Sequence, residues 1–295
     1  MSTPLQGAAR AHEAARPQLG ILLCLLSMLI FAAQDGITKV LVRDLPIMQL
    51  VMVRYWVFLL FAIAYCTYRG GVRNASRSRH PFLQIIRALL GVGDIVLFGI
   101  GLRYLGLAEM HALYAVFPLM TLGLAGLFLK EYIGLRRWLA AGVGFLGTVV
   151  ILRPGTGVFE LAALIPLISA LGFAFFGVLT RRISQDDSFA TNMLYMGVIG
   201  AIAVTVLGLP LWVTPTGTEW VLLGILSMTG VVAQLLLLQA LRYATASTLQ
   251  PFNYSLLLFA TLIGLLVFGE LPDNWTIIGA CLVIAGGLYA AKVKS

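Results

Sequence analysis

Ten apolar stretches of about 20 residues dominate the chain, and about 20 apolar residues are what an α-helix needs to cross a bilayer. The stretches form two sets of five whose closing parts align without a gap. Leu102 recurs as Leu241 and Glu131 recurs as Glu270, each 139 positions later. Helices are therefore predicted at 19–42, 46–67, 82–102, 107–129 and 134–152, and again at 158–180, 189–210, 219–241, 246–268 and 274–291.

An odd number of crossings means that a duplicated unit enters the membrane the second time from the opposite side. Inverted repeats of this kind are how many secondary transporters are built. We expect an all-α integral membrane protein with ten transmembrane helices, arranged as two inverted five-helix repeats around a central cavity. The expected divisions are an N-terminal tail at 1–18, the repeats at 19–153 and 154–292, and a C-terminal tail at 293–295.

The composition agrees with a membrane protein. Hydrophobic residues make up 60% of the chain and charged residues only 11%, against about 25% charged in a soluble domain. Ten helices occupy about 200 of the 295 positions, so we expect no soluble catalytic domain. Cys24, Cys66 and Cys281 all lie in apolar stretches, where packing is a better explanation than a disulfide framework.

The basic residues that give the chain its net charge of +8 divide unequally between the two sides of the membrane. With the N-terminus in the cytoplasm, fourteen basic residues fall on that side and only Arg43, Arg103 and Arg153 on the other. The positive-inside rule therefore predicts that both termini are cytoplasmic. The basic connection 69–81 is expected to lie beside anionic lipid rather than to bind nucleic acid, and the first apolar stretch is read as an uncleaved helix.

Two runs of residues resemble a known family. The first is Phe31 to Lys39, followed by Pro46 and Arg54; the second is Pro118 to Glu131 with the glycine-rich helix after it. Both resemble EamA-type members of the drug/metabolite transporter superfamily. The resemblance covers about 19–291 and implies a ten-helix carrier with a central cavity, which moves small metabolites, often outward across a bacterial inner membrane. It places the chain near the bacterial amino-acid exporters.

Ionisable residues inside the predicted helices are the main candidates for function, because a charge at the centre of a bilayer is costly unless it is paired or hydrated. Counting along the helices puts several of them in the outer half of the first repeat. We predict an outer-gate network of Asp35, Lys39, Arg54, Asp94 and Glu109. The alternative is a purely structural cluster, with Lys39 and Glu109 reaching the interface.

A second group of residues is predicted to line the substrate cavity: His111, Tyr114, Phe175, Phe176, Gln234, Gln250, Asn253 and Tyr254. Amides and hydroxyls suit contacts to a zwitterion, although interhelical hydrogen bonds explain each of them equally well. His111 is a candidate for proton coupling, with simple packing as the alternative. Candidate hinges are the prolines within predicted helices, Pro118, Pro166 and Pro251, where curvature around a cavity is the alternative.

The predicted function is alternating-access export of small metabolites, with amino acids as the leading substrate class. A passive channel or facilitator is the alternative. The chain lacks the G-x-x-x-x-G-K-[ST] and H-E-x-x-H motifs, and we expect neither an enzyme nor a resident cofactor or metal. The expected partners are a small-molecule substrate and the lipid of a bacterial inner membrane, with the protein as a monomer or a homodimer.

Overall fold

The computed structural model describes residues 17–128, 134–152, 161–244, 249 and 252–292. Within these residues the fold is entirely helical. The first half contains α2 (Pro17–Leu41), α3 (Ile47–Tyr68), the short α4 (Val72–Ala75), α5 (Pro81–Tyr104), α6 (Leu107–Tyr114), α7 (Phe117–Phe128) and α8 (Leu135–Leu152). The second half contains α9 (Leu164–Ile183), α10 (Phe189–Gly208), α11 (Gly217–Tyr243), α13 (Ser255–Phe268) and α14 (Asn274–Lys292), with 3-10 turns at Leu161–Ala163 and Leu209–Leu211.

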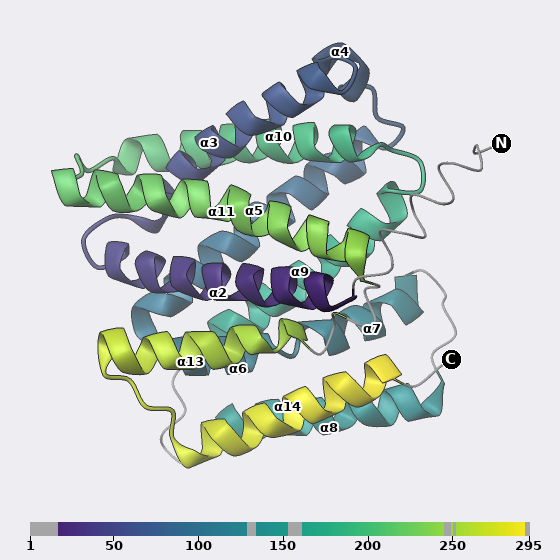
Figure 1. Ribbon diagram of the computed structural model, residues 1–295, viewed down its shortest axis with the longest axis vertical. Coiled ribbons are helices and arrows are strands. Elements are labelled where there is room, and N and C mark those ends of the chain that lie inside the picture. The colour runs from purple at the N-terminus through teal and green to yellow at the C-terminus, as the bar shows by residue number, and fades with distance from the viewer. Residues whose placement is uncertain (1–16, 129–133, 153–160, 245–248, 250–251, 293–295) are drawn as a thin grey trace.

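The long helices run side by side across the molecule, with α3 and α10 at one edge and α8 and α14 at the other (Figure 1). Alternate helices run in opposite directions. We call the end of the bundle at which α2 begins the Pro17 end, and the opposite end the Leu41 end.

Seven of the described segments are long and apolar enough to cross a membrane, and three shorter apolar helices accompany them. The shorter ones are Trp138–Leu152, Ser255–Phe268 and Asn274–Tyr289. Large apolar side chains stand outward from the bundle; Leu60 is 69% exposed and Leu266 is 80% exposed. Such a surface requires lipid around it, because soluble proteins rarely expose wide apolar patches.

Local sequence explains where the helices begin and end. Pro81 opens α5 at a position where its missing N–H has no intrahelical partner to lose. Thr216 and Glu219 form a capping box at the start of α11. Gly269 ends α13 with a φ of 68°, in the left-handed region that favours glycine.

One predicted helix is divided in the structure. The prediction over 107–129 becomes α6 and α7, with Ala115 and Val116 between them. The break lies just before Pro118. A proline ring clashes with the carbonyl group four residues earlier, and proline has no backbone N–H to donate. Pro166, by contrast, lies in the first turn of α9, where a proline leaves the helix intact. Pro251 lies outside the described residues.

Glycines allow α8 and α14 to pack in close contact. A Cβ atom on Gly147 would lie 2.6 Å from the carbonyl oxygen of Gly279, and one on Gly279 would lie 2.5 Å from the carbonyl oxygen of Gly147. Gly286 lies equally close to the backbone of Ala140. Small residues bring backbones together in this way in membrane helices, so this glycine pattern serves packing within one chain.

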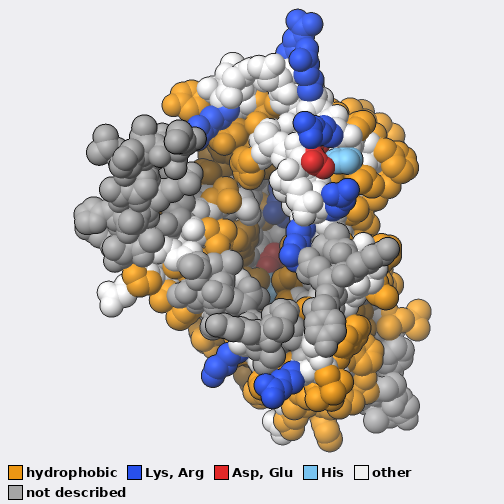
Figure 2. All heavy atoms as spheres, turned by 90° about the vertical axis from the view of Figure 1, so that its right-hand side faces the viewer, with side chains coloured by type: hydrophobic (Ala, Val, Ile, Leu, Met, Phe, Trp, Pro, Cys, Tyr) orange, Lys and Arg blue, Asp and Glu red, His pale blue; other side chains and the backbone are white. Residues whose placement is uncertain are grey.

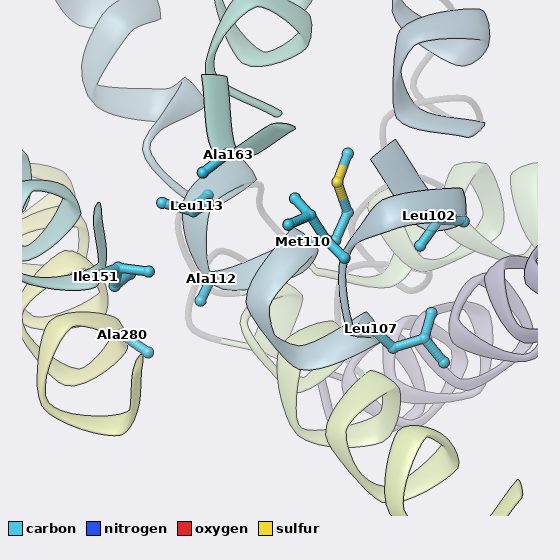
Figure 3. Close-up of a cluster of buried hydrophobic side chains, with 9 residues drawn as sticks. Leu102, Leu107, Met110, Ala112, Leu113, Ile151, Ala163 and Ala280 are labelled. Carbon is cyan, nitrogen blue, oxygen red and sulfur yellow. The ribbon is translucent and has the colours of Figure 1, made fainter. Parts of the chain in front are cut away.

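The largest buried apolar cluster surrounds α6 (Figure 3). Leu107, Met110, Ala112 and Leu113 of α6 pack against residues of α5, α8 and α14 and against the turn before α9. The half-helix is thus held from several sides. It carries His111 and Tyr114, so this core fixes the position of both polar side chains.

Candidate functional site

The Pro17 end of the bundle is hollowed near its middle. Figure 2 views this end and shows hydrophobic side chains on the walls, basic side chains around the rim and an acidic side chain inside the hollow. Asp94 and Asp35, which are described first, lie farther along the bundle, toward the Leu41 end.

Asp94 of α5 is held by two neighbouring helices. The hydroxyl of Ser169 on α9 donates to Asp94 Oδ1 at 2.6 Å. The hydroxyl of Tyr114 at the end of α6 lies 3.1 and 3.2 Å from the two carboxylate oxygens. The Asp94 residue is only 8% exposed. Among the described residues, no Lys, Arg or His side chain forms an ion pair with Asp94, and a buried carboxylate of this kind is a candidate binding group.

A second polar group lies between α2, α3 and α6. His111 Nε2 is 3.0 Å from Asp35 Oδ2, and Arg54 donates to the side-chain oxygen of Gln34 at 3.2 Å. A Cβ atom on Gly230 of α11 would lie 3.2 Å from that same oxygen, so the glycine leaves room for the amide. Asp35 also interacts electrostatically with both Arg54 and Asp94.

Aromatic rings extend from these polar residues toward the Pro17 end. Phe98 lies 5.2 Å from His111 and 5.1 Å from Tyr114, measured between ring centroids. Tyr114 then contacts Phe173 at 6.0 Å, and Phe173 stacks on Phe176 at 5.7 Å. These separations are typical of favourable aromatic pairs. We call this row of Phe98, Tyr114, Phe173 and Phe176 the aromatic row; Phe117 packs beside it.

Lys39 makes an ion pair at the Leu41 end that joins the two halves of the chain. Its ammonium group lies 2.6 Å from Glu270 Oε1 and donates to the carbonyl oxygen of Leu105 at 2.7 Å. The backbone N–H of Leu107 donates to Glu270 Oε2 at 3.1 Å. We call these contacts the Lys39–Glu270 latch. They join α2, the α5–α6 connection and the α13–α14 connection, which belong to opposite halves of the chain.

The Pro17 end carries its own polar contacts, between the α4–α5 connection and the α9–α10 turn. Asp187 accepts hydrogen bonds from Ser78, from the backbone N–H of Arg79 at 2.9 Å and from the Gln84 amide at 2.9 Å. Arg87 donates to the side chain of Gln84 at 2.8 Å and to the carbonyl of Asn192 at 2.6 Å. This network ties the two halves together beside the hollow.

Two carboxylates in the α9–α10 turn, Asp187 and Asp186, have shifted pKa values. Burial raises the pKa of Asp187, but the hydrogen bonds from Ser78, Arg79 and Gln84 outweigh it, and the pKa lies below its ordinary value. The hydrogen bond from His80, 2.8 Å away, is the main cause that lowers the pKa of Asp186. Both groups are therefore ionised near neutral pH.

The residues predicted for the outer gate do not form one network. Asp35, Arg54 and Asp94 lie within electrostatic reach of one another, whereas Lys39 pairs with Glu270 at the end of the bundle. Glu109 lines a pocket of about 360 Å³ at the Leu41 end, together with Glu270 and Asp273. Glu270, which pairs with Lys39, was not among the predicted gate residues, although its repeat relation to Glu131 had marked it.

The residues predicted for the cavity also divide. Tyr114 and Phe176 lie in the aromatic row and His111 contacts its first ring, but Phe175 faces Phe128 of α7 instead. Asn253 accepts from the thiol of Cys24 at 3.3 Å.

The remaining cavity candidates lie elsewhere. The hydroxyl of Tyr254 lies against Gly287 of α14, and Gln234 is exposed on α11. Gln250 lies outside the described residues. Within the described part of the chain, no cluster of three His, Cys, Asp or Glu side chains has the geometry to hold a metal ion.

Comparison with known proteins gives a consistent assignment. The model of the EamA-like transporter family matches residues 18–153 and 160–290. A riboflavin transporter of Vibrio cholerae is 30% identical over 272 residues, covering 91% of each chain. An S-adenosylmethionine uptake transporter of Rickettsia felis is 28% identical over 265 residues, covering 90% of each chain. The pseudopaline exporter CntI of Pseudomonas aeruginosa is 24% identical over 93% of this chain and 96% of its own.

One solved structure, titled only as the crystal structure of a protein, shares the fold. Its TM-score is 0.59 at 19% identity, over 95% of this chain and 98% of the other. The names of the relatives do not support the predicted amino-acid export, because most of them refer to uptake of S-adenosylmethionine or to riboflavin. The family and these relatives are transporters rather than enzymes. The chain belongs to the EamA-like transporter family and is a multi-pass membrane transporter.

Proposed function

We propose that the protein is a secondary carrier that moves small organic metabolites by alternating access. The observation that carries this proposal is the hollow that enters the bundle from one end. The Pro17 end is hollowed, while the Lys39–Glu270 latch joins both halves at the Leu41 end. A carrier opens one end at a time, whereas a channel needs a path through both.

The packing of the helices supports ten crossings in two inverted repeats. If the halves are equivalent, α2 corresponds to α9, α3 to α10, α5 to α11 and α8 to α14. Exchange of the halves then relates the contact of α2 with α11 to the contact of α9 with α5. The same exchange relates α3 to α10 and α8 to α14, and the helices of each of these pairs are in contact. The divided helix α6–α7 lies beside the polar residues, as discontinuous helices do at transporter binding sites.

The basic side chains support an orientation with the Pro17 end in the cytoplasm of a bacterial cell. Arg69, Arg73, Arg77 and Arg79 lie in or next to the α3–α5 connection at that end, and Arg181 and Arg182 close α9 there. Such an excess marks the cytoplasmic face. In this orientation the hollow opens inward, to the cytoplasm, and the latch closes the outer side.

Counterflow in proteoliposomes tests the proposal. Vesicles with the purified chain are preloaded with unlabelled S-adenosylmethionine, riboflavin or an amino-acid mixture and diluted into the labelled compound. A carrier accumulates label transiently and saturates, because each turnover exchanges one side for the other. Absence of counterflow for the whole panel, or an ohmic current in its place, would overturn the carrier and favour a channel.

A further inference from the structure

The polar residues at the middle of the bundle carry an unbalanced charge. Asp35 and Asp94 supply two carboxylates, and Arg54 supplies one guanidinium group. Counted as ionised, these three side chains leave one negative charge, and His111 Nε2 lies 3.0 Å from Asp35 Oδ2. A net charge at this depth is costly, so the group is most stable when a positive charge joins it.

The neighbouring helices do not supply that charge. The described residues of α7, α10 and α13 contain no Asp, Glu, Lys, Arg or His. On α5, Arg87 is 3% exposed; its guanidinium lies 5.5 Å from the centroid of the Phe176 ring and donates to Gln84 and Asn192 toward the Pro17 end. On α2, Lys39 pairs with Glu270 at the other end. On α6, Glu109 lines the pocket at the Leu41 end. On α9 and α11 the charges lie at the helix ends.

A buried donor beside these residues also lacks a partner. The Nε2 atom of Gln34 has no hydrogen-bond partner in the described part of the protein, and Gln34 is 2% exposed. Its Oε1 atom already accepts from Arg54. A buried donor left unpaired costs about 1–3 kcal/mol, and it marks a position where a polar atom of a ligand is stabilised.

The aromatic row begins at the same residues. Tyr114 donates to Asp94 and is itself one of the rings. The rings of Phe173 and Phe176 are stacked, with planes 15° apart. Aromatic faces stabilise flat ring systems and cations alike. The row thus provides a wall for a flat group directly beside the Asp94 carboxylate.

We infer that this site binds an organic cation that carries a flat heteroaromatic ring. The cationic centre lies near Asp94 and Asp35, and the ring lies against Tyr114 and Phe173. This inference rests on the proposed function, since it assigns a substrate class to the same carrier. S-adenosylmethionine has this chemistry, with a sulfonium beside an adenine-bearing ribose; riboflavin has the flat ring without a fixed cation.

A matched pair of ligands tests the charge requirement. S-adenosylhomocysteine lacks one methyl group of S-adenosylmethionine and, with it, the sulfonium charge. We measure both dissociation constants by isothermal titration with the purified full-length chain in detergent, for the wild type and for Asp94→Asn. The wild type is expected to bind S-adenosylmethionine at least tenfold more tightly, and Asp94→Asn to remove that preference.

Controls separate charge recognition from folding. Asp44→Asn removes an exposed carboxylate from the α2–α3 turn and is expected to keep the wild-type preference. If Asp94→Asn does not fold, Tyr114→Phe serves as the second variant. It keeps the ring but loses the hydroxyl that donates to Asp94, and it is expected to retain only part of the preference. Equal affinity for the two ligands in the wild type, or a preference that survives in Asp94→Asn, overturns the inference. Counterflow of riboflavin without binding of S-adenosylmethionine also overturns it, while the carrier itself stands.

Discussion

Replacing Glu270 with Gln is expected to open the Leu41 end of the bundle. The carboxylate holds the buried Lys39 ammonium at 2.6 Å and accepts the Leu107 N–H at 3.1 Å. The amide keeps the shape of the side chain but removes its charge. The single amide oxygen can accept from Lys39 or from the Leu107 N–H but not from both, and Lys39 otherwise keeps its hydrogen bond to the Leu105 carbonyl.

The size of the effect follows from the burial of the two partners. The Lys39 side chain is 8% exposed and that of Glu270 is 31% exposed, so water screens the pair only in part. A hydrogen bond to a charged group contributes about 1.5–3 kcal/mol. We therefore expect Glu270→Gln to weaken the closed state by about 2 kcal/mol, which corresponds to about a 30-fold shift in population.

Thiol labelling measures that shift. Cys24, Cys66 and Cys281 are replaced by serine, and a single cysteine replaces Ala108, which is 6% exposed and lines the pocket at the Leu41 end. The labelling rate with a soluble maleimide reports how often this end opens. The rate should rise by about 30-fold in Glu270→Gln, and an unchanged rate would refute the latch. Asp44→Asn, a charge loss at the same end, should leave the rate unchanged.

Other consequences follow at the helix contacts and at the Pro17 end. Gly147→Ala places a Cβ atom 2.6 Å from the Gly279 carbonyl oxygen and should cost about 1–3 kcal/mol, seen as a lower Tm in detergent. Gly142→Ala, where a Cβ atom meets nothing within 4 Å, should not lower the Tm; equal losses in both variants would contradict the packing. The lowered pKa of Asp187 stabilises the fold above the unfolded pKa of about 4. That stabilisation is lost as the pH falls through the lowered value, so the wild-type Tm should drop on acidification more than that of Asp187→Asn, and parallel curves would contradict this.

The sequence by itself determined the class of the protein and the depth of its polar residues. Long apolar stretches dictate helices in a bilayer because no other local structure satisfies the backbone there. The same reasoning, by counting residues from the helix ends, put Asp35, Arg54 and Asp94 at one level. Those three are close enough to interact in the structure. Spacing of this kind is a local property, so it can be read from the chain.

The tertiary structure decided which polar groups meet. Lys39 is four residues from Asp35 on one helix face, yet its partner is Glu270, 231 positions later. Likewise Gly147 and Gly279 complete one contact from opposite halves, and Tyr254 faces Gly287 rather than the polar residues on α5. Partners from distant helices depend on how the helices rotate and pack against one another. Apolar surfaces in lipid have no strong preference for one rotation over another, so these pairings follow from close packing and not from the apolar pattern.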